Sequence, residues 1–161
     1  MQRMKKRFPF GQRGVALIEF ALALPVLMFL LIGLIEIGRL AYFGIELGNA
    51  AHAGAQYGAI PGKAGDFTGM QTIATNDGQN TIDPAMTATA SNVCTCWTGT
   101  SQSPSPPTAS ACGSPCTNGG RKQTYVQVSV TGTARALFNY RDLGLPSSWT
   151  VTRVATIQAA Q

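Results

Sequence analysis

An apolar run near the amino terminus constrains this 161-residue chain more than any other feature. The run extends from Val15 to Ile35, and Glu19 is its only charged residue. As a helix it would measure about 31 Å, which matches the hydrocarbon core of a bilayer. A removable secretory signal would have a shorter apolar core of about 7 to 15 residues, ending at a small-residue cleavage site. We therefore predict a transmembrane helix at residues 15–35, embedded in a lipid bilayer.

The basic residues are unevenly distributed. Five of the twelve precede Gly14 without any acidic residue among them, and the other seven balance seven acidic residues. Lys and Arg beside a first membrane span hold that end in the cytoplasm. We therefore predict a cytoplasmic leader at 1–14 and an extracytoplasmic remainder. A nucleic-acid partner is not expected, because no second basic patch or aromatic platform follows.

Glu19 places a carboxylate inside the predicted span. Such a group costs about 2.5 to 3.5 kcal/mol on insertion scales, so it usually faces a partner or a polar cavity. If the chain were cut after Gly14, the new amino group at Val15 would offer a cation, on this chain or on a neighbour. At ~4 Å and an effective dielectric of ~20 the gross attraction is about 4 kcal/mol. Alternatively, Glu19 lies close to the headgroups and favours the positive end of the helix dipole.

The helical pattern continues past the span to about Gly58, shortly before Pro61. A helix over 15–58 would be roughly 65 Å long. Small residues recur along its outer half at four-residue spacing, which lets two helix backbones approach closely; they include Gly44, Gly48, Gly54 and Gly58. We favour helix packing at these glycines over the alternative that the helix frays.

Residues 59–161 are predicted to form a small extracytoplasmic head. Helical spacing from Phe67 to Ala74 predicts one short helix, with Thr68 and Gln71 resembling a capping box and Asp77-Gly78 as its end. Three strands are predicted at 86–93, 125–131 and 149–157, the last with a bulge near Val151 and Val154 that breaks the alternation. The fold class is therefore α+β, with the long helix extending into a small antiparallel sheet.

Four cysteines, Cys94, Cys96, Cys112 and Cys116, bracket a Ser/Pro/Thr-rich insertion at 94–116. Outside the cytoplasm disulfides persist, and a bridge closing a loop of ~15 residues stabilises a fold by about 3 kcal/mol. We predict two disulfides, either Cys94–Cys116 with Cys96–Cys112 or the crossed pairing. A zinc site is the alternative, although C-x-C is not a usual zinc spacing.

Catalytic chemistry is not indicated by any motif. The single histidine, His52, lies on the glycine-rich helix without a base or ligand set around it. Phosphate-cradling glycine loops and nucleophile elbows are missing from the sequence. Short carboxylates such as Asp66 sit beside turn formers, where they cap helices and bend the backbone. We predict no catalytic residues, no metal site and no cofactor.

The amino-terminal third resembles a known family. A basic leader precedes residues 13–27, which read RGVALIEFALALPVL, and residues 33–39, which read GLIEIGR. The glycine, the glutamate five residues later, the aromatic Phe20 and the apolar helix resemble a class III signal of type IV pilin-like proteins. The longer pattern, including Pro25, Glu36 and Arg39, resembles the TadE-like family, the minor pilins or pseudopilins of tight-adherence (Flp-type) pili.

This resemblance implies a pilin-like fold and a role in pilus assembly. It implies that a membrane prepilin peptidase cuts between Gly14 and Val15, and that Glu19 and Phe20 belong to the processing site. Other pilin or pseudopilin subunits and an inner-membrane assembly platform are the implied partners. The implied location is the bacterial inner membrane, single-pass with a periplasmic head, or an extracellular pilus. An uncleaved, signal-anchored periplasmic binding protein is the second hypothesis, and an extracytoplasmic enzyme is the third.

Overall fold

The computed structural model describes residues 13–78, 86–97, 112–113, 116, 121–138 and 146–160. The chain divides into two compact units, residues 1–39 and 40–161, of which the second is the head. The leader residues 1–12 and the Ser/Pro/Thr-rich residues 98–111 lie outside the described part of the chain.

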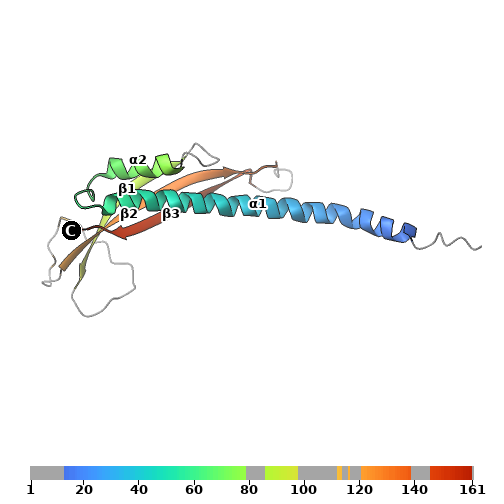
Figure 1. Cartoon of the computed structure of the whole chain (residues 1–161), viewed down its shortest axis with the longest axis horizontal. Helices are drawn as coiled ribbons and strands as arrows, with labels where there is room; N and C mark the ends of the chain where they lie inside the picture. Colours follow the sequence, from blue (N-terminus) through green and yellow to red (C-terminus); the bar gives the residue numbers. More distant parts are fainter. Residues whose placement is uncertain are drawn as a thin grey trace, which may run out of the picture. The chain divides into compact units, whose positions relative to one another are not determined.

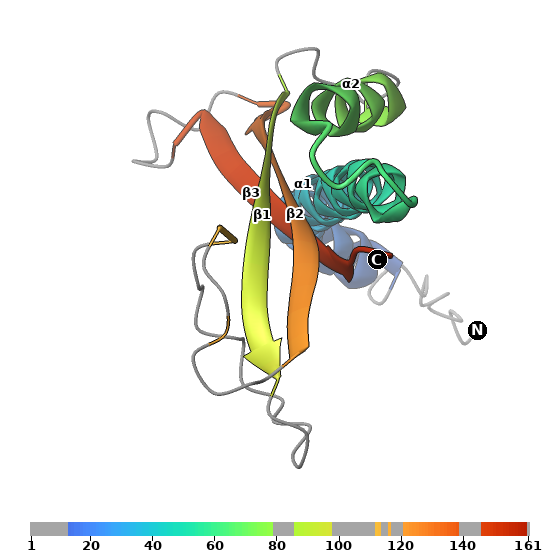
Figure 2. The same ribbon diagram turned by 90° about the vertical axis from the view of Figure 1, so that its left-hand side faces the viewer.

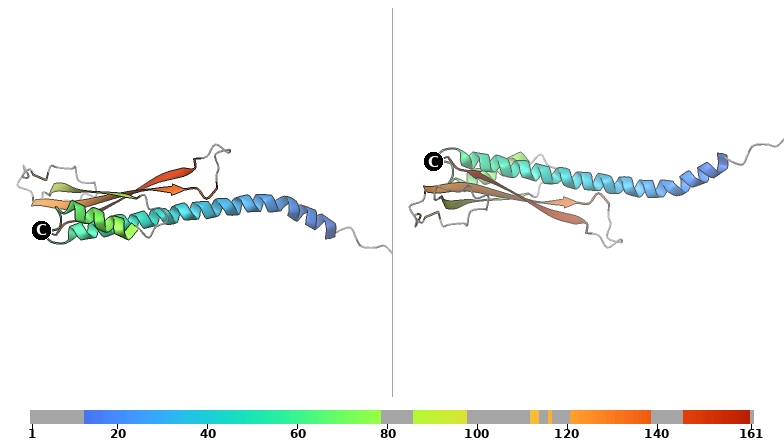
Figure 3. Two further views of the ribbon diagram at one scale, coloured as in Figure 1. Left: turned by 90° about the horizontal axis from the view of Figure 1, so that it is seen from above. Right: turned by 90° about the horizontal axis from the view of Figure 1, so that it is seen from below.

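Helix α1 extends from Arg13 to Ala59 and contains Pro25. A proline inside a helix cannot donate the hydrogen bond that the carbonyl four residues earlier would accept, here that of Ala21. Membrane helices tolerate this loss because neighbouring groups satisfy the freed carbonyl. The amino-terminal part of α1, drawn in blue, is bent in Figure 3.

The head contains the carboxyl-terminal part of α1, one short helix and one sheet. The sheet has the order β1-β2-β3, with antiparallel pairing between neighbours. Both helices cover the same face of the sheet (Figures 1 and 2). The predicted α+β class is confirmed, and the bounds of the elements are α2 Phe67–Gly78, β1 Thr87–Trp97, β2 Arg121–Arg135 and β3 Ser148–Gln158.

The core lies between the helices and the middle strand. Alternate residues of β2 are fully buried, as the alternating pattern predicts. The helix residues that pack against them are mostly small, so the core is thin. The buried hydrophobic cluster consists of Phe43, Leu47, Ala50, Ala51 and Ala55 of α1, Met70 and Ala74 of α2, Val126, Val128 and Val130 of β2, and Ala159.

The bulge predicted in the third strand is wrong. Strand β3 pairs with β2 in continuous register from Ser148 to Gln158. Val151 is paired with Gly132 on the core face, whereas Val154 lies on the outer face with 55 % of its surface exposed. Arg153 occupies a position on the same face as Val151. Because this position holds an arginine, the sequence of β3 does not show the regular alternation of apolar and polar residues that the strand has.

The connection between α1 and α2 is a tight turn. Ile60 and Lys63 donate backbone hydrogen bonds to the carbonyls of Tyr57 and Ile60, at 3.2 and 3.0 Å. Gly62 adopts a φ of +79° within this turn. A side chain is disfavoured at this φ, so glycine allows the chain to reverse direction here.

We expect opposite effects from adding a methyl group at two glycines of α1. At Gly54 the new Cβ would lie 2.7 Å from the Met70 carbonyl oxygen and 3.0 Å from the Ala74 Cβ, whereas at Gly48 it would meet nothing within 4 Å. Gly54→Ala should destabilise the head by about 1 to 3 kcal/mol through overpacking. Gly48→Ala should be neutral or stabilising by up to about 1 kcal/mol, because alanine favours helix.

Denaturant unfolding of the full chain in detergent, followed by near-ultraviolet circular dichroism, measures both changes. Equal effects of the two substitutions would contradict the close α1–α2 approach at Gly54.

Candidate functional site

The predicted processing motif lies in the first turns of α1. The helix begins at Arg13, so the peptide bond between Gly14 and Val15 belongs to its first turn. Amide groups in a first helical turn have no partner within the helix. Gly14, Val15, Glu19 and Phe20 are all exposed in the isolated chain. Val15 and Glu19 are four residues apart and therefore share one helix face.

The surface that follows this motif is apolar on all sides. Phe29 is 73 % exposed and Leu22 is 72 % exposed. The other large hydrophobic residues from 15 to 37 are also exposed, except Ile32, which is half-buried. A soluble helix would bury such a surface, whereas a membrane helix presents it to lipid. Within the described residues, α1 is the one helix long and apolar enough to cross a membrane. It fits a single-pass membrane anchor.

Charged and aromatic residues follow the end of the apolar run. Arg39 Nη1 lies 3.8 Å from Glu36 Oε1, an ion pair with i, i+3 spacing. Tyr42 follows one turn later and is 54 % exposed. Its hydrogen bond to Glu46 and the negative charge there raise the pKa of Tyr42. Tyrosine and basic residues gather where membrane helices leave the bilayer, so this sequence of residues fits an exit point.

The glycines of α1 have different surroundings. Gly54 faces the Met70 carbonyl, and Gly58 faces the Met70 side chain, so both allow α2 to approach α1 within the same chain. Gly44 lies against Arg153, whereas a Cβ added at Gly48 would have no neighbour within 4 Å. Packing of these glycines between different chains stays a prediction.

Arg153 links the edge strand β3 to α1. Its Nε donates a hydrogen bond to the Gly44 carbonyl oxygen at 3.2 Å. Sequence patterns could not predict this contact, because the two residues are 109 positions apart. A charged side chain turned inward on an edge strand also discourages pairing with another chain.

The cysteines form two pairs at disulfide distance. Cys94 pairs with Cys112 and Cys96 with Cys116, with Cα–Cα distances of 5.0 and 5.6 Å. This is the crossed one of the two pairings that the sequence left open. In this arrangement the sulfurs are bonded to each other, and they are not thiolate ligands. The two bonds attach residues 112 and 116 to β1, and Cys94 is buried beside β2.

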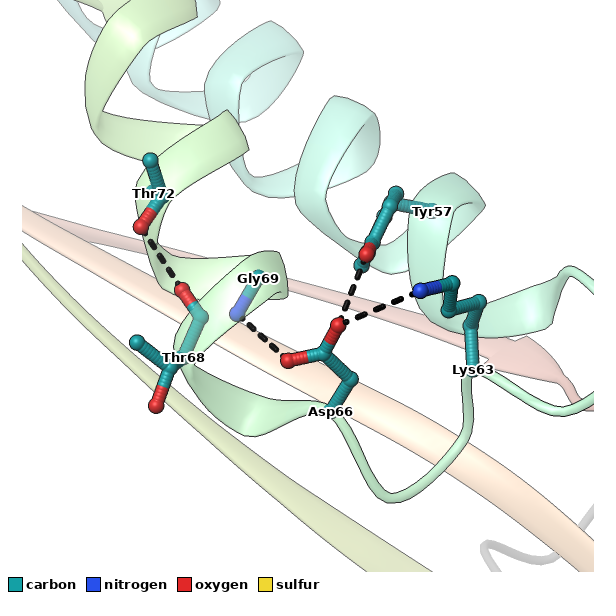
Figure 4. Close-up of polar contacts among 6 residues, drawn as sticks. All are labelled: Tyr57, Lys63, Asp66, Thr68, Gly69 and Thr72. Atoms are coloured by element: carbon teal, nitrogen blue, oxygen red, sulfur yellow. Dashed lines mark hydrogen bonds and ion pairs between the residues drawn. The ribbon is translucent and has the colours of Figure 1, made fainter.

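Asp66 organises the start of α2 (Figure 4). Its Oδ1 accepts the Gly69 backbone N–H at 2.9 Å, and its Oδ2 accepts the Tyr57 hydroxyl at 2.7 Å. Lys63 Nζ lies 3.6 Å from the same Oδ2. The hydrogen bond from Tyr57, that from Gly69 and the Lys63 charge lower the pKa of Asp66. Asp66 is therefore the helix cap, and the capping box predicted at Thr68 and Gln71 is wrong.

The described part of the chain contains no group of three or more His, Cys, Asp or Glu residues that could hold a metal ion. The single histidine, His52, is exposed on the surface of α1. An open depression of about 370 Å³ lies beside the end of α1 and is lined by Ala59, Arg121, Gln123, Gln158, Ala159 and Ala160. This lining has one charged residue and no pairing of a nucleophile with a base.

These observations define a class of protein: a small α+β head built on the outer half of a helix whose inner half fits a membrane anchor. The model of the TadE-like protein family matches residues 14–56. The resemblance stated above is confirmed over this segment, which is about a quarter of the chain. Comparison with curated proteins and with solved structures gave no match.

We expect peptide mapping to recover the crossed cysteine pairing. Mass spectrometry of the non-reduced, alkylated chain should show Cys94 linked to Cys112 and Cys96 linked to Cys116. Reduction should destabilise the head, since closing loops of 18 and 20 residues is worth about 3 kcal/mol each in the chain-entropy model, less any overlap between them. Four alkylated cysteines in the chain extracted from an oxidising compartment would contradict the pairing.

The stability of the head should depend on pH through Asp66. Because its pKa is lowered on folding, its stabilising effect is present above the ordinary aspartate pKa of about 3.9 and is lost as the pH falls below that value. Asp66→Asn keeps an oxygen for the Gly69 N–H but removes the charge.

The difference in unfolding free energy between wild type and Asp66→Asn should therefore shrink from pH 6 to pH 3, a range set by the aspartate pKa of about 3.9. Asp77→Asn, an exposed carboxylate near the other end of α2, is the matched control and should keep the wild-type profile. A difference for Asp66→Asn that does not change with pH would refute this role of its charge.

Proposed function

We propose that this chain is a membrane-anchored pseudopilin, or minor pilin, of a tight-adherence pilus. A prepilin peptidase cuts it between Gly14 and Val15, and it then supports pilus assembly without an enzymatic activity of its own. The match of residues 14–56 to the TadE-like family is the observation that carries this proposal. The anchor holds the head on the periplasmic side of the inner membrane, with the leader in the cytoplasm.

The position of the scissile bond supports processing. Gly14 carries no side chain, and a Cβ placed on it would meet nothing within 4 Å, so the backbone there is open to an enzyme. The exposed Glu19 and Phe20 follow on the next turn, where a peptidase recognises them. The basic leader before the bond gives the orientation that leaves the bond on the cytoplasmic side.

Glu19 links processing to assembly. Cleavage creates an ammonium group at Val15, four residues before Glu19, at an axial distance of about 6 Å. The carboxylate pairs with this amino group or with that of a neighbouring subunit. At ~4 Å and an effective dielectric of ~20 this pair gains about 4 kcal/mol of gross attraction. This offsets an insertion cost of about 2.5 to 3.5 kcal/mol for the acid.

The mass of the chain extracted from membranes tests the proposal. We expect an amino terminus at Val15 in cells with active prepilin peptidase, and an intact Met1 start in cells without it. An intact start in both would favour the second hypothesis, an uncleaved anchor whose head binds another envelope component.

The charge of Glu19 is tested by Glu19→Gln, which keeps the size of the side chain. This variant should still insert into the membrane but should lower processing, pilus assembly or both. Glu36→Gln is the matched control, because it removes a carboxylate that pairs with Arg39 within the same chain. Normal piliation with Glu19→Gln would exclude the charge pair, even if cleavage occurs.

A further inference from the structure

The third strand of the sheet ends before the second one does. Strand β3 ends at Gln158, which pairs with Tyr125 of β2, whereas the pairing of β2 with β1 continues to Arg121. Figure 2 shows the ends of β1 and β2 extending past the end of β3. The first residues of β2, 121–124, therefore lie beyond the end of the third strand.

The chain turns away from the sheet after β3. The Ala159 amide donates a hydrogen bond to the Thr124 carbonyl at 2.8 Å, and the Ala160 amide donates one to the Ala59 carbonyl at the end of α1, at 3.2 Å. The open depression of about 370 Å³ lies at this turn, between the end of α1 and the first residues of β2. Its volume is near the lower end of the range for small-molecule sites, so it suits a small ligand or one or two residues of a peptide.

Three polar side chains line this depression, and they share one face of the sheet. Arg121 and Gln123 alternate along β2 with residues that point to the core face. Gln158 of β3 pairs with Tyr125, which is two residues after Gln123 and on the same face. The described lining residues include no carboxylate, and the others are all alanines: Ala59, Ala159 and Ala160.

These side chains offer mainly hydrogen-bond donors. The guanidinium of Arg121 carries N–H donors and no acceptor. Gln123 Oε1 accepts the Tyr125 hydroxyl at 3.0 Å, so the N–H donors of Gln123 Nε2 remain for another group. Among the described residues, the Arg121 guanidinium has no ion-pair partner. The depression is therefore positively charged and rich in donors.

We propose that this depression binds a carboxylate of a peptide, from an acidic side chain or from a carboxyl terminus. The planar guanidinium of Arg121 pairs with both carboxylate oxygens. The amides of Gln123 and Gln158 bond to the peptide groups beside the carboxylate. An amide side chain matches a peptide group in donors and acceptors, which favours a peptide over a sugar acid as the ligand. This site belongs to the head alone, and it depends neither on the membrane anchor nor on cleavage.

Nuclear magnetic resonance of the full chain in detergent micelles tests this proposal. The side-chain N–H signals of Arg121, Gln123 and Gln158 are followed while short alanine peptides with blocked amino ends are added. One peptide has a central Glu and an amidated end, the second has a free carboxyl end and no Glu, and the third has a central Gln and an amidated end. At least one of the two carboxylate peptides should shift these signals in a saturable way. The uncharged peptide should bind about ten-fold more weakly or less, because hydrogen bonds to charged groups are the stronger ones.

Variants of Arg121 separate a specific site from general charge attraction, with the two glutamine signals as the readout. Arg121→Gln should weaken binding of the carboxylate peptide by about ten-fold or more. Arg121→Lys keeps the charge but loses the two-pronged geometry, so it should weaken binding several-fold. Arg153→Gln is the matched control, because it removes a positive charge from the same sheet at the position paired with Val130, away from the depression. It should leave the affinity unchanged.

Three results would overturn the site. These are shifts of equal size with the uncharged peptide, shifts that do not saturate, and an equal loss of affinity for Arg121→Gln and Arg153→Gln. Shifts with glucuronate but with neither carboxylate peptide would overturn the assignment to a peptide. Unfolding curves like that of the wild type establish that each variant is folded. None of these results bears on the amino terminus of the chain, so a failure here is distinct from a failure of the proposed function.

Discussion

The packing of the outer half of α1 against the middle of β2 is the contact on which the head depends. Leu47, Ala50, Ala51 and Ala55 are fully buried there, opposite three fully buried valines. Each buried Val or Leu contributes about 1.5 to 3 kcal/mol to the free energy of unfolding. A core of alanines and a few larger residues therefore stabilises the head only weakly. The small residues are needed because they let the helices and the sheet approach closely. Since α1 supplies much of this core, the helix that fits the membrane anchor is also a structural element of the head.

Polar and covalent links at the periphery supplement this thin core. The two cysteine pairs attach residues 112 and 116 to β1. The hydrogen bonds that Asp66 accepts from Tyr57 and Gly69 fix the turn between α1 and α2. Arg153 ties the opposite edge strand to α1 through the Gly44 carbonyl. Small domains commonly need such links, because they bury too little apolar surface to be stable without them. The inward arginine also protects the free edge of β3 from pairing with another chain.

The features of α1 occur in an order that fits its proposed role. The residues proposed for processing come first, then the apolar surface, then the Glu36–Arg39 ion pair, and finally the face that packs in the head. One continuous element thus joins the proposed processing site to the folded domain.

Local pattern predicted much of this protein, because periodicity and composition act over a few residues. The apolar run, the short helix and the alternation of β2 followed from the sequence. So did the resemblance of residues 13–39 to the TadE-like family, whose model matches residues 14–56. Tertiary structure alone decided the crossed cysteine pairing and the inward position of Arg153. These depend on which residues meet in space across long separations, and spacing along the chain does not encode that choice. The same reason explains the wrong prediction of a bulge in β3. Arg153 interrupts the apolar pattern of the strand, and only the structure shows that its side chain bonds to the Gly44 carbonyl of α1.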